Sequence, residues 1–162
     1  MTVEELIEKL KKFANMEKAY IFDLDGTIFD ISHRLHYIQQ KPKNWSAFNN
    51  ASIKDTFLKP GITILKALAK SGIKIIFVSG RPEDQLDIIS EKFKFMRDDL
   101  KFADYYLRPV NDFRTDVELK EDILNILRKK YDIICAFDDR TRVVQMYRKN
   151  GIPCYQVAEG NF

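Results

Sequence analysis

"AYIFDLDGT", residues 19–27, is an apolar run that ends in two aspartates and a glycine. Residues 20–22 show no polar alternation, which is typical of a strand covered on both faces in a parallel sheet, and Gly26 allows the chain to turn abruptly. Open α/β sheets bind their ligands at the carboxyl ends of the strands, and side chains two positions apart in an extended chain point to the same side. The stretch therefore predicts a buried strand that presents Asp23 and Asp25 together at a ligand-binding edge.

The composition fits one globular domain over residues 1–162. Hydrophobic residues make up 45% and charged residues 31% of the chain, which allows one substantial core and leaves no room for a second catalytic domain. The formal net charge of +3 is too small to indicate a partner by itself. No stretch approaches the roughly 20 apolar residues of a membrane span, and the first residues lack a signal-peptide pattern. We therefore expect a soluble, cytoplasmic protein without a membrane partner.

Hydrophobic periodicity predicts alternating helices and strands after the first strand. Helical spacing covers residues 59–70, 83 onward, 116–130 and 141–150, and strand-like runs cover 73–78, 104–108, 133–137 and 152–157. Pro153 favours an edge position for the last strand. Strands that alternate with helices indicate a parallel sheet with crossover helices. We therefore predict an α/β fold with three layers, a Rossmann-like arrangement around a mostly parallel five-stranded sheet.

Two segments lie outside this alternation. Residues 2–15 combine a possible capping box with helical apolar spacing, which predicts an N-terminal helix within residues 1–17. We expect it to pack on the domain as a cover, the alternative being a docking helix for another subunit. Residues 30–55 show no strand signal, and residues 30–58 are expected to form a small cap insertion that folds over the active edge.

Several side chains of the insertion have two open interpretations. Trp45 and Phe48 either stack on a base, as in single-strand binders, or form the small core of the insertion. His33 and His36 either touch the substrate or have a structural role, and the sequence shows no acidic partner for them.

Four polar clusters follow predicted strands or lie near the start of a predicted helix. They are Asp23 with Asp25, Ser79 with Arg81, Lys120, and Asp138 with Asp139. Parallel topology brings such positions to one edge of the sheet. Taken singly, Ser79 is better explained as a helix cap and Lys120 as a solvated lysine. The ordered set is more specific than any one of its members.

This set suits phosphoryl transfer. A phosphomonoester dianion repels an attacking anion, so the site needs positive charge as well as a nucleophile. Asp23, Asp138 and Asp139 offer the hard oxygen ligands that suit Mg²⁺. Asp23 would attack phosphorus to form an aspartyl-phosphate, and Asp25 would protonate the leaving oxygen and then activate water. Lys120 would supply a point charge for the phosphate oxygens.

The order of the four clusters resembles the four motifs of the haloacid dehalogenase (HAD) superfamily, from about residue 20 to the end of the chain. The resemblance implies a HAD-fold phosphatase with Mg²⁺ as its cofactor. It also implies that Asp25 ligates Mg²⁺ through its main-chain carbonyl, beside the carboxylates of Asp23, Asp138 and Asp139. Gly80 then belongs to the phosphate-binding motif together with its two neighbours.

Residues 137–148 and 154–158 resemble, more narrowly, the phosphatase domain of bacteriophage-type polynucleotide kinase/3′-phosphatases. This resemblance implies that Arg34, eleven residues after the nucleophile, and Arg81 bind phosphate. It also implies that Asp116, one helical turn before Lys120, supports that lysine. Arg140 is expected to add a further cationic donor.

The expected function is Mg²⁺-dependent removal of a 3′-phosphate from a DNA or RNA end. The chain contains no GxxxxGK[ST] motif, so 5′-kinase activity is not expected, and the resemblance leaves room for a separate kinase or ligase and for a phage or viral source. The main alternative is a nucleotidase acting on free nucleoside monophosphates, for which a more closed lid would be expected. A non-catalytic HAD-fold binding protein is a third hypothesis, which the complete set of polar residues argues against.

Overall fold

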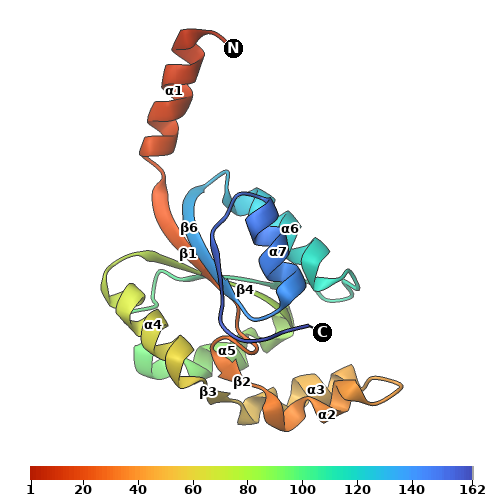
Figure 1. Cartoon of the computed structure of the whole chain (residues 1–162). Coiled ribbons are helices and arrows are strands. Elements are labelled where there is room, and N and C mark those ends of the chain that lie inside the picture. Colours follow the sequence, from red (N-terminus) through yellow and green to blue (C-terminus); the bar gives the residue numbers. More distant parts are fainter. Residues whose placement is uncertain (162) are drawn as a thin grey trace.

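The computed structural model describes residues 1–161. Five parallel strands form one sheet in the spatial order β5-β4-β1-β6-β7 (Figure 1). They are β1 (Glu17–Phe22), β4 (Lys74–Pro82), β5 (Asp104–Arg108), β6 (Tyr131–Asp138) and β7 (Cys154–Gln156). Strand β1 pairs with β4 on one side and β6 on the other, so it occupies the centre of the sheet. The predicted α/β fold is confirmed, and the last strand lies at an edge as predicted.

Helices cover both faces of the sheet (Figure 1). One face is covered by α6 (Asp116–Leu127) and α7 (Thr141–Lys149), and the other by α4 (Lys59–Lys70) and α5 (Leu86–Lys92). Ile21 belongs to the core cluster beneath the first pair of helices, and Phe22 to the cluster beneath the second. Because successive strand residues point to opposite faces, a strand covered on both sides needs apolar residues at every position. This explains the absence of polar alternation in β1.

The segment between β1 and α4 extends from the carboxyl end of the sheet (Figure 1). Its elements are β2 (Phe29–Asp30), η1 (Ser32–Arg34), α2 (His36–Gln39), α3 (Trp45–Asn50), η2 (Ala51–Lys54) and β3 (Thr56–Phe57). Strands β2 and β3 pair antiparallel, with Phe29 opposite Phe57, and form the stem from which the helices project. The prediction of no strand from residue 30 to residue 55 was therefore wrong at Asp30, and β3 lies just beyond that range. Each strand has two residues, which is too short for a periodic pattern to show.

Strand β4 is longer than the sequence pattern predicts. Serine, glycine and proline at positions 79–82 are typical of a turn, so the run appeared to end at Val78. In the structure Pro82 still pairs with Arg108 of β5, after a register shift. Ser79 and Arg81 therefore lie within the strand. The helical part follows as η3 (Glu83–Gln85), α5 and, after it, η4 (Lys94–Met96).

Helix α1 (Val3–Ala14) forms where it was predicted, with both hydrogen bonds of the capping box between Thr2 and Glu5. It projects away from the sheet (Figure 1), and none of its residues is buried, so the prediction that it packs as a cover is wrong. Helical spacing defines an apolar face but does not specify what covers it.

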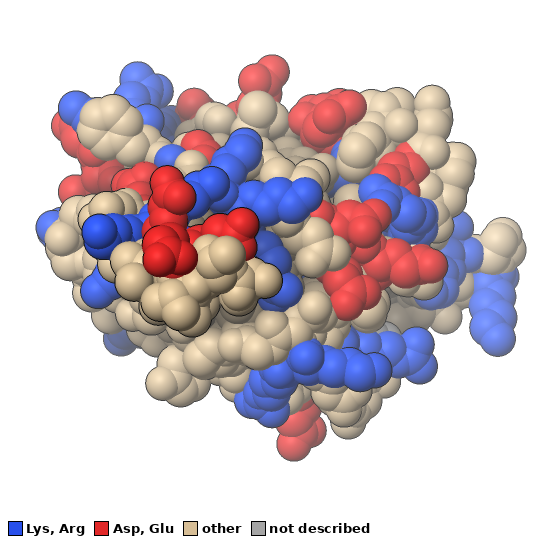
Figure 2. Space-filling view, turned by 90° about the horizontal axis from the view of Figure 1, so that it is seen from above, with Lys and Arg blue, Asp and Glu red and all other residues tan. Residues whose placement is uncertain are grey.

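Viewed from above, the molecule shows basic and acidic side chains intermixed (Figure 2). Within residues 1–161 no helix is long and apolar enough to cross a bilayer.

The exposure of α1 leads to a stability prediction. Because Leu10 is 60% exposed, Leu10→Glu should change the free energy of unfolding by no more than about 0.5 kcal/mol. The comparison variant Leu65→Ala removes a fully buried side chain beneath α4 and should cost about 2–5 kcal/mol. Urea denaturation at low protein concentration measures both. A loss for Leu10→Glu as large as that for Leu65→Ala would instead show that α1 packs on the domain.

Candidate active site

Asp23 directly follows β1, and residues of β6 and α6 contact it. Its main-chain N–H donates to the carbonyl of Phe137 at 2.9 Å, which continues the pairing of β1 with β6 past the end of β1. Its side chain is buried. From α6, Lys120 Nζ donates to Asp23 Oδ1 and to Asp138 Oδ2, both at 2.7 Å. One buried ammonium group therefore links the carboxyl ends of β1 and β6.

Three buried carboxylates meet at this point. Oxygen atoms of Asp23, Asp138 and Asp139 lie within 4.8 Å of one another. Burial raises the pKa of Asp23 well above its usual range against the opposing charge of Lys120, and the charges of Asp138 and Asp139 raise it further. Burial and then the charge of Asp138 raise the pKa of Asp139 to about 6. A cluster with this excess of negative charge and hard oxygen donors fits a divalent cation.

Lys120 remains charged in this setting. Burial by itself would lower its pKa, but the charges of Asp138 and Asp23 outweigh that effect and hold the pKa well above its usual range. The ammonium group is therefore a fixed positive charge beside the nucleophile candidate Asp23.

The turn after β1 requires glycine at position 26. Gly26 has a φ of +79°, in the left-handed region that side chains disfavour. A Cβ atom at this position would also lie 2.2 Å from Asp139 Oδ2. The carboxylate of Asp139 thus packs directly against the turn, a contact that the glycine signal in the sequence did not reveal.

Asp25 has different partners from Asp23. Its Oδ1 accepts hydrogen bonds from Arg81 Nε at 2.6 Å and from Arg34 Nη2 at 3.1 Å. Its side chain is 22% exposed, whereas both arginine side chains are buried. The two aspartates of the opening motif therefore have different partners. Asp23 contacts Lys120 within the carboxylate cluster, and Asp25 contacts the guanidinium groups of Arg34 and Arg81.

Asp55 is a buried carboxylate that sequence reasoning missed. It accepts from Arg34 Nε at 2.8 Å and Arg34 Nη2 at 2.7 Å, and it also accepts from Arg81 Nη2. His33 Nε2 lies 2.9 Å from Asp55 Oδ1, so this histidine does have an acidic partner, contrary to the sequence reading. The sequence offered only an indirect indication of Asp55. If Arg34 and Arg81 are both buried, they need a second anionic partner in addition to Asp25.

Arg81 has an unused hydrogen-bond donor. Its Nη1 is the one buried side-chain nitrogen or oxygen within residues 1–161 that has no hydrogen-bond partner. The main-chain N–H of Arg81 donates to Ser79 Oγ at 3.2 Å, and Ser79 is itself buried. Buried polar groups are normally paired, and a phosphate oxygen is a strong acceptor for a guanidinium group. The residues of this strand end therefore fit an anionic ligand.

Asp116 binds two arginines. Its Oδ1 accepts from Arg108 Nη2 at 2.5 Å and its Oδ2 from Arg140 Nη1 at 2.7 Å. Lys120 instead donates to Asp23 and Asp138, so the expected support of Lys120 by Asp116 is limited to the charge of Asp116, which adds to the raised pKa of the lysine. Arg108, which also donates to the carbonyl of Gly80 at 3.1 Å, was not singled out from the sequence.

Gly80 and Arg140 contact two of these carboxylates, Asp116 and Asp138. A Cβ atom on Gly80 would be 2.6 Å from Asp116 Oδ1, so the glycine allows the carboxylate to approach β4 closely. The main-chain N–H of Arg140 donates to Asp138 Oδ1 at 3.0 Å and helps to orient that carboxylate. His36 is exposed, and its ring lies 4.0 Å from that of Tyr37, outside the hydrogen-bonded clusters described above.

The burial of Asp55 leads to a second stability prediction. Asp55→Ala leaves Arg34 and Arg81 buried with Asp25 as their one remaining carboxylate, which should cost about 3 kcal/mol of unfolding free energy. Glu91→Ala, which removes an exposed ion pair with Lys94, should leave the unfolding midpoint unchanged. Chemical denaturation of the two variants measures the difference. Equal midpoints would show that Asp55 is dispensable to the buried arginines.

The raised pKa of Asp139 leads to a pH-dependent prediction for the metal-free protein. A carboxyl group with a higher pKa in the folded state destabilises the fold above that pKa, and the effect disappears as pH falls through about 6 toward the unfolded value near 3.8. In EDTA, Asp139→Asn should therefore stabilise the protein by on the order of 3 kcal/mol at pH 8 and by about a third of that at pH 4.5.

Thermal or urea unfolding at the two pH values measures this effect. With a saturating divalent cation at pH 8, the unaltered protein should become the more stable of the two, because the cation binds the ionised ligand set. A stability difference in EDTA that does not vary with pH would contradict the role assigned to burial of Asp139.

Comparison with known proteins identifies the family. A family model described as the polynucleotide kinase PNKP phosphatase domain matches residues 17–162. A protein of Autographa californica nuclear polyhedrosis virus, assigned as a bifunctional polynucleotide kinase/RNA ligase, is 31% identical over an alignment of 167 residues that covers 94% of this chain and 22% of the viral protein.

Solved structures agree with this assignment. A chain of the Pnkp1/Rnl/Hen1 RNA repair complex has a TM-score of 0.74 and 28% identity, covering 91% of this chain and 44% of that one. The class C acid phosphatase from Bacillus anthracis has a TM-score of 0.61 at 19% identity, covering 98% of this chain and 74% of that one, and shows the shared fold. The chain thus spans less than half the length of the viral relative and of the repair-complex chain. Since the family model matches almost the whole chain, the protein belongs to the HAD-fold family of polynucleotide kinase PNKP phosphatase domains.

Proposed function

We propose that this chain is a Mg²⁺-dependent phosphomonoesterase that removes 3′-phosphates from nucleic-acid ends through an aspartyl-phosphate intermediate. The observation that carries the proposal is the position of Lys120 Nζ, 2.7 Å from both Asp23 and Asp138 at the carboxyl edge of the sheet. In support of the proposal, the buried carboxylate of Asp23 lies beside a permanent positive charge and a set of hard oxygen donors. Phosphoryl transfer needs all three, because the substrate and the nucleophile are both anionic.

Each step has a residue to perform it. An oxygen of Asp23 attacks phosphorus, the bond from phosphorus to the leaving oxygen breaks, and Asp25 gives that oxygen a proton. Asp25 then takes a proton from the water that hydrolyses the Asp23 phosphate. The two guanidinium groups on Asp25 Oδ1 fix the orientation of this acid–base group, and its partial exposure gives water access to it.

The remaining residues bind the phosphate and the metal. Arg81 Nη1, buried without a hydrogen-bond partner among residues 1–161, is available to donate to a phosphate oxygen, and we assign Arg34, Lys120, Ser79 and the main chain at Gly80 to the same phosphate. Asp116, Arg108 and Arg140 support this end of β4 and β6. Mg²⁺ bound to Asp23, Asp138, Asp139 and the carbonyl of Asp25 would reduce the repulsion between nucleophile and phosphate.

The choice of a nucleic-acid end as substrate rests on the family. The chain belongs to the phosphatase domains of polynucleotide kinases, and its relatives include a chain of an RNA repair complex and a protein assigned as a kinase and ligase. Residues 1–162 contain no phosphate-binding loop of the GxxxxGK[ST] type. We infer that the chain supplies the 3′-end step, and that kinase and ligase activities come from elsewhere in a repair system.

Phosphate release from four substrates tests the proposal. With Mg²⁺, a 3′-phosphorylated oligonucleotide should have a kcat/KM at least about tenfold higher than that of a 5′-mononucleotide, corresponding to roughly 1.4 kcal/mol of transition-state preference. A nucleoside 3′-monophosphate and p-nitrophenyl phosphate complete the comparison, and DNA and RNA versions of the oligonucleotide are assayed in parallel.

Two variants serve as controls. Asp23→Asn should lower activity on every substrate by at least about 10³-fold, the scale of loss when a nucleophile is removed. Asp98→Asn, at an exposed position in the segment before β5, should retain activity. Equal or better turnover of the 5′-mononucleotide would favour the nucleotidase alternative, and full activity of Asp23→Asn would refute the proposed mechanism.

A further inference from the structure

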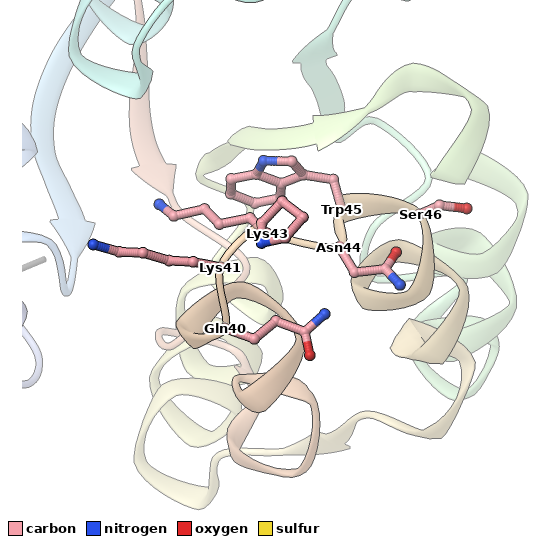
Figure 3. A pocket seen from close by; sticks show the side chains of 7 residues that line it. Gln40, Lys41, Lys43, Asn44, Trp45 and Ser46 are labelled. Atoms are coloured by element: carbon pink, nitrogen blue, oxygen red, sulfur yellow. The ribbon is translucent and has the colours of Figure 1, made fainter.

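The loop between α2 and α3 carries a basic and aromatic pocket. The pocket has a volume of about 570 Å³ and is lined by Gln40, Lys41, Pro42, Lys43, Asn44, Trp45 and Ser46 (Figure 3). No carboxylate lines it, and the sequence from residue 31 to residue 54 contains no Asp or Glu at all. On the face seen from above, the two signs of charge are intermixed (Figure 2). The pocket is therefore a local site for an anionic ligand.

The two aromatic residues of this region have separate roles. Phe48 is 6% exposed and its ring packs against the Arg34 guanidinium group, 4.1 Å from the ring centre. Trp45 is 51% exposed and meets the Phe48 ring edge to face, with the ring centres 5.8 Å apart. Phe48 thus belongs to the core of the insertion. Trp45 packs against Phe48 and leaves about half of its surface accessible.

Ring contacts through Phe48 relate the pocket to Arg34. In the view of Figure 3, Lys41, Lys43 and Trp45 extend toward the same side of the loop, and Gln40 extends in another direction. Lys43 Nζ lies 5.5 Å from the centre of the Trp45 ring. Through Phe48, the indole is at most about 10 Å from the Arg34 guanidinium group, which itself contacts Asp25. A nucleotide adjacent to one bound at the active site would reach this distance.

We propose that Trp45, Lys41 and Lys43 form a subsite for a single-stranded nucleic acid on the 5′ side of the nucleotide that bears the 3′-phosphate. This inference rests on the proposed function and adds the means by which the enzyme distinguishes a strand from a mononucleotide. A base stacks on the exposed face of Trp45, since aromatic side chains bind single strands in this way without sequence preference. Lys41 and Lys43 bind backbone phosphates next to that base.

Tryptophan fluorescence gives a direct test, because Trp45 is the one tryptophan of the chain. The Asp23→Asn variant is titrated with a 3′-phosphorylated single-stranded oligonucleotide, a nucleoside 3′-monophosphate and inorganic phosphate, and binding is followed independently by fluorescence anisotropy of a dye on the oligonucleotide. The oligonucleotide should change the emission of Trp45, and inorganic phosphate should not. Oligonucleotide binding without any change in Trp45 emission would overturn the subsite.

Steady-state kinetics give a second test. Trp45→Ala should lower kcat/KM for the oligonucleotide by about 10- to 100-fold, the range for loss of one stacked base, and leave p-nitrophenyl phosphate hydrolysis unchanged. Trp45→Phe, which keeps an aromatic face, should recover most of the loss. The Lys41→Ala/Lys43→Ala double variant should reduce the slope of log(kcat/KM) against log salt by up to about two.

The matched control uses a similar pair elsewhere on the surface. Lys101 Nζ lies 4.7 Å from the ring centre of Phe102, which is 74% exposed and precedes β5 at the amino edge of the sheet. Lys101→Ala/Phe102→Ala should behave like the unaltered protein. Equal losses for Trp45→Ala on p-nitrophenyl phosphate would show a structural role and refute the subsite. An unaltered protein that hydrolyses p-nitrophenyl phosphate but releases no phosphate from the oligonucleotide would instead refute the proposed function itself.

Discussion

The position of the Lys120 ammonium group between Asp23 and Asp138 determines much of the arrangement at the carboxyl edge of the sheet. The two aspartates end neighbouring central strands, so the parallel topology itself forces negative charges together. Without a cation they would repel one another or take up protons, and burial makes that tendency stronger, as the raised pKa of Asp23 shows. Helix α6 supplies the missing charge because it packs on the face of the sheet beside both strands.

Hydrogen bonds between arginines and aspartates link the insertion to the sheet. Arg81 comes from β4 and Arg34 from the insertion, yet both contact the same two carboxylates, Asp25 and Asp55. Buried guanidinium groups are tolerated where each has several anionic or carbonyl acceptors. The position of the insertion relative to the sheet edge is therefore determined by hydrogen-bonded charges, in addition to the short β2–β3 stem.

The sequence could predict the features that depend on local pattern. The unalternating run of β1 predicts a strand covered on both faces, and the spacing of α6 places Lys120 near the start of its helix. It could not predict which charges meet across the fold. The partners of Asp116 come from β5 and the start of α7, and Asp55 lies 21 positions after Arg34 without any motif around it. The sequence pattern predicted a strand that ends at Val78. In the structure β4 continues to Pro82, because its polar end pairs with β5.

The two parts of the molecule thus differ in what constrains them. At the sheet edge, each charged side chain has partners on neighbouring strands or helices, so a change at one position disturbs several others. At the tip of the insertion, Trp45 contacts Phe48 and Lys43, and among residues 1–161 Phe48 is the residue that joins Trp45 to Arg34. The chemistry therefore depends on residues that the fold holds tightly. In the subsite proposed above, recognition of what lies beyond the phosphate would depend on an exposed segment outside the sheet.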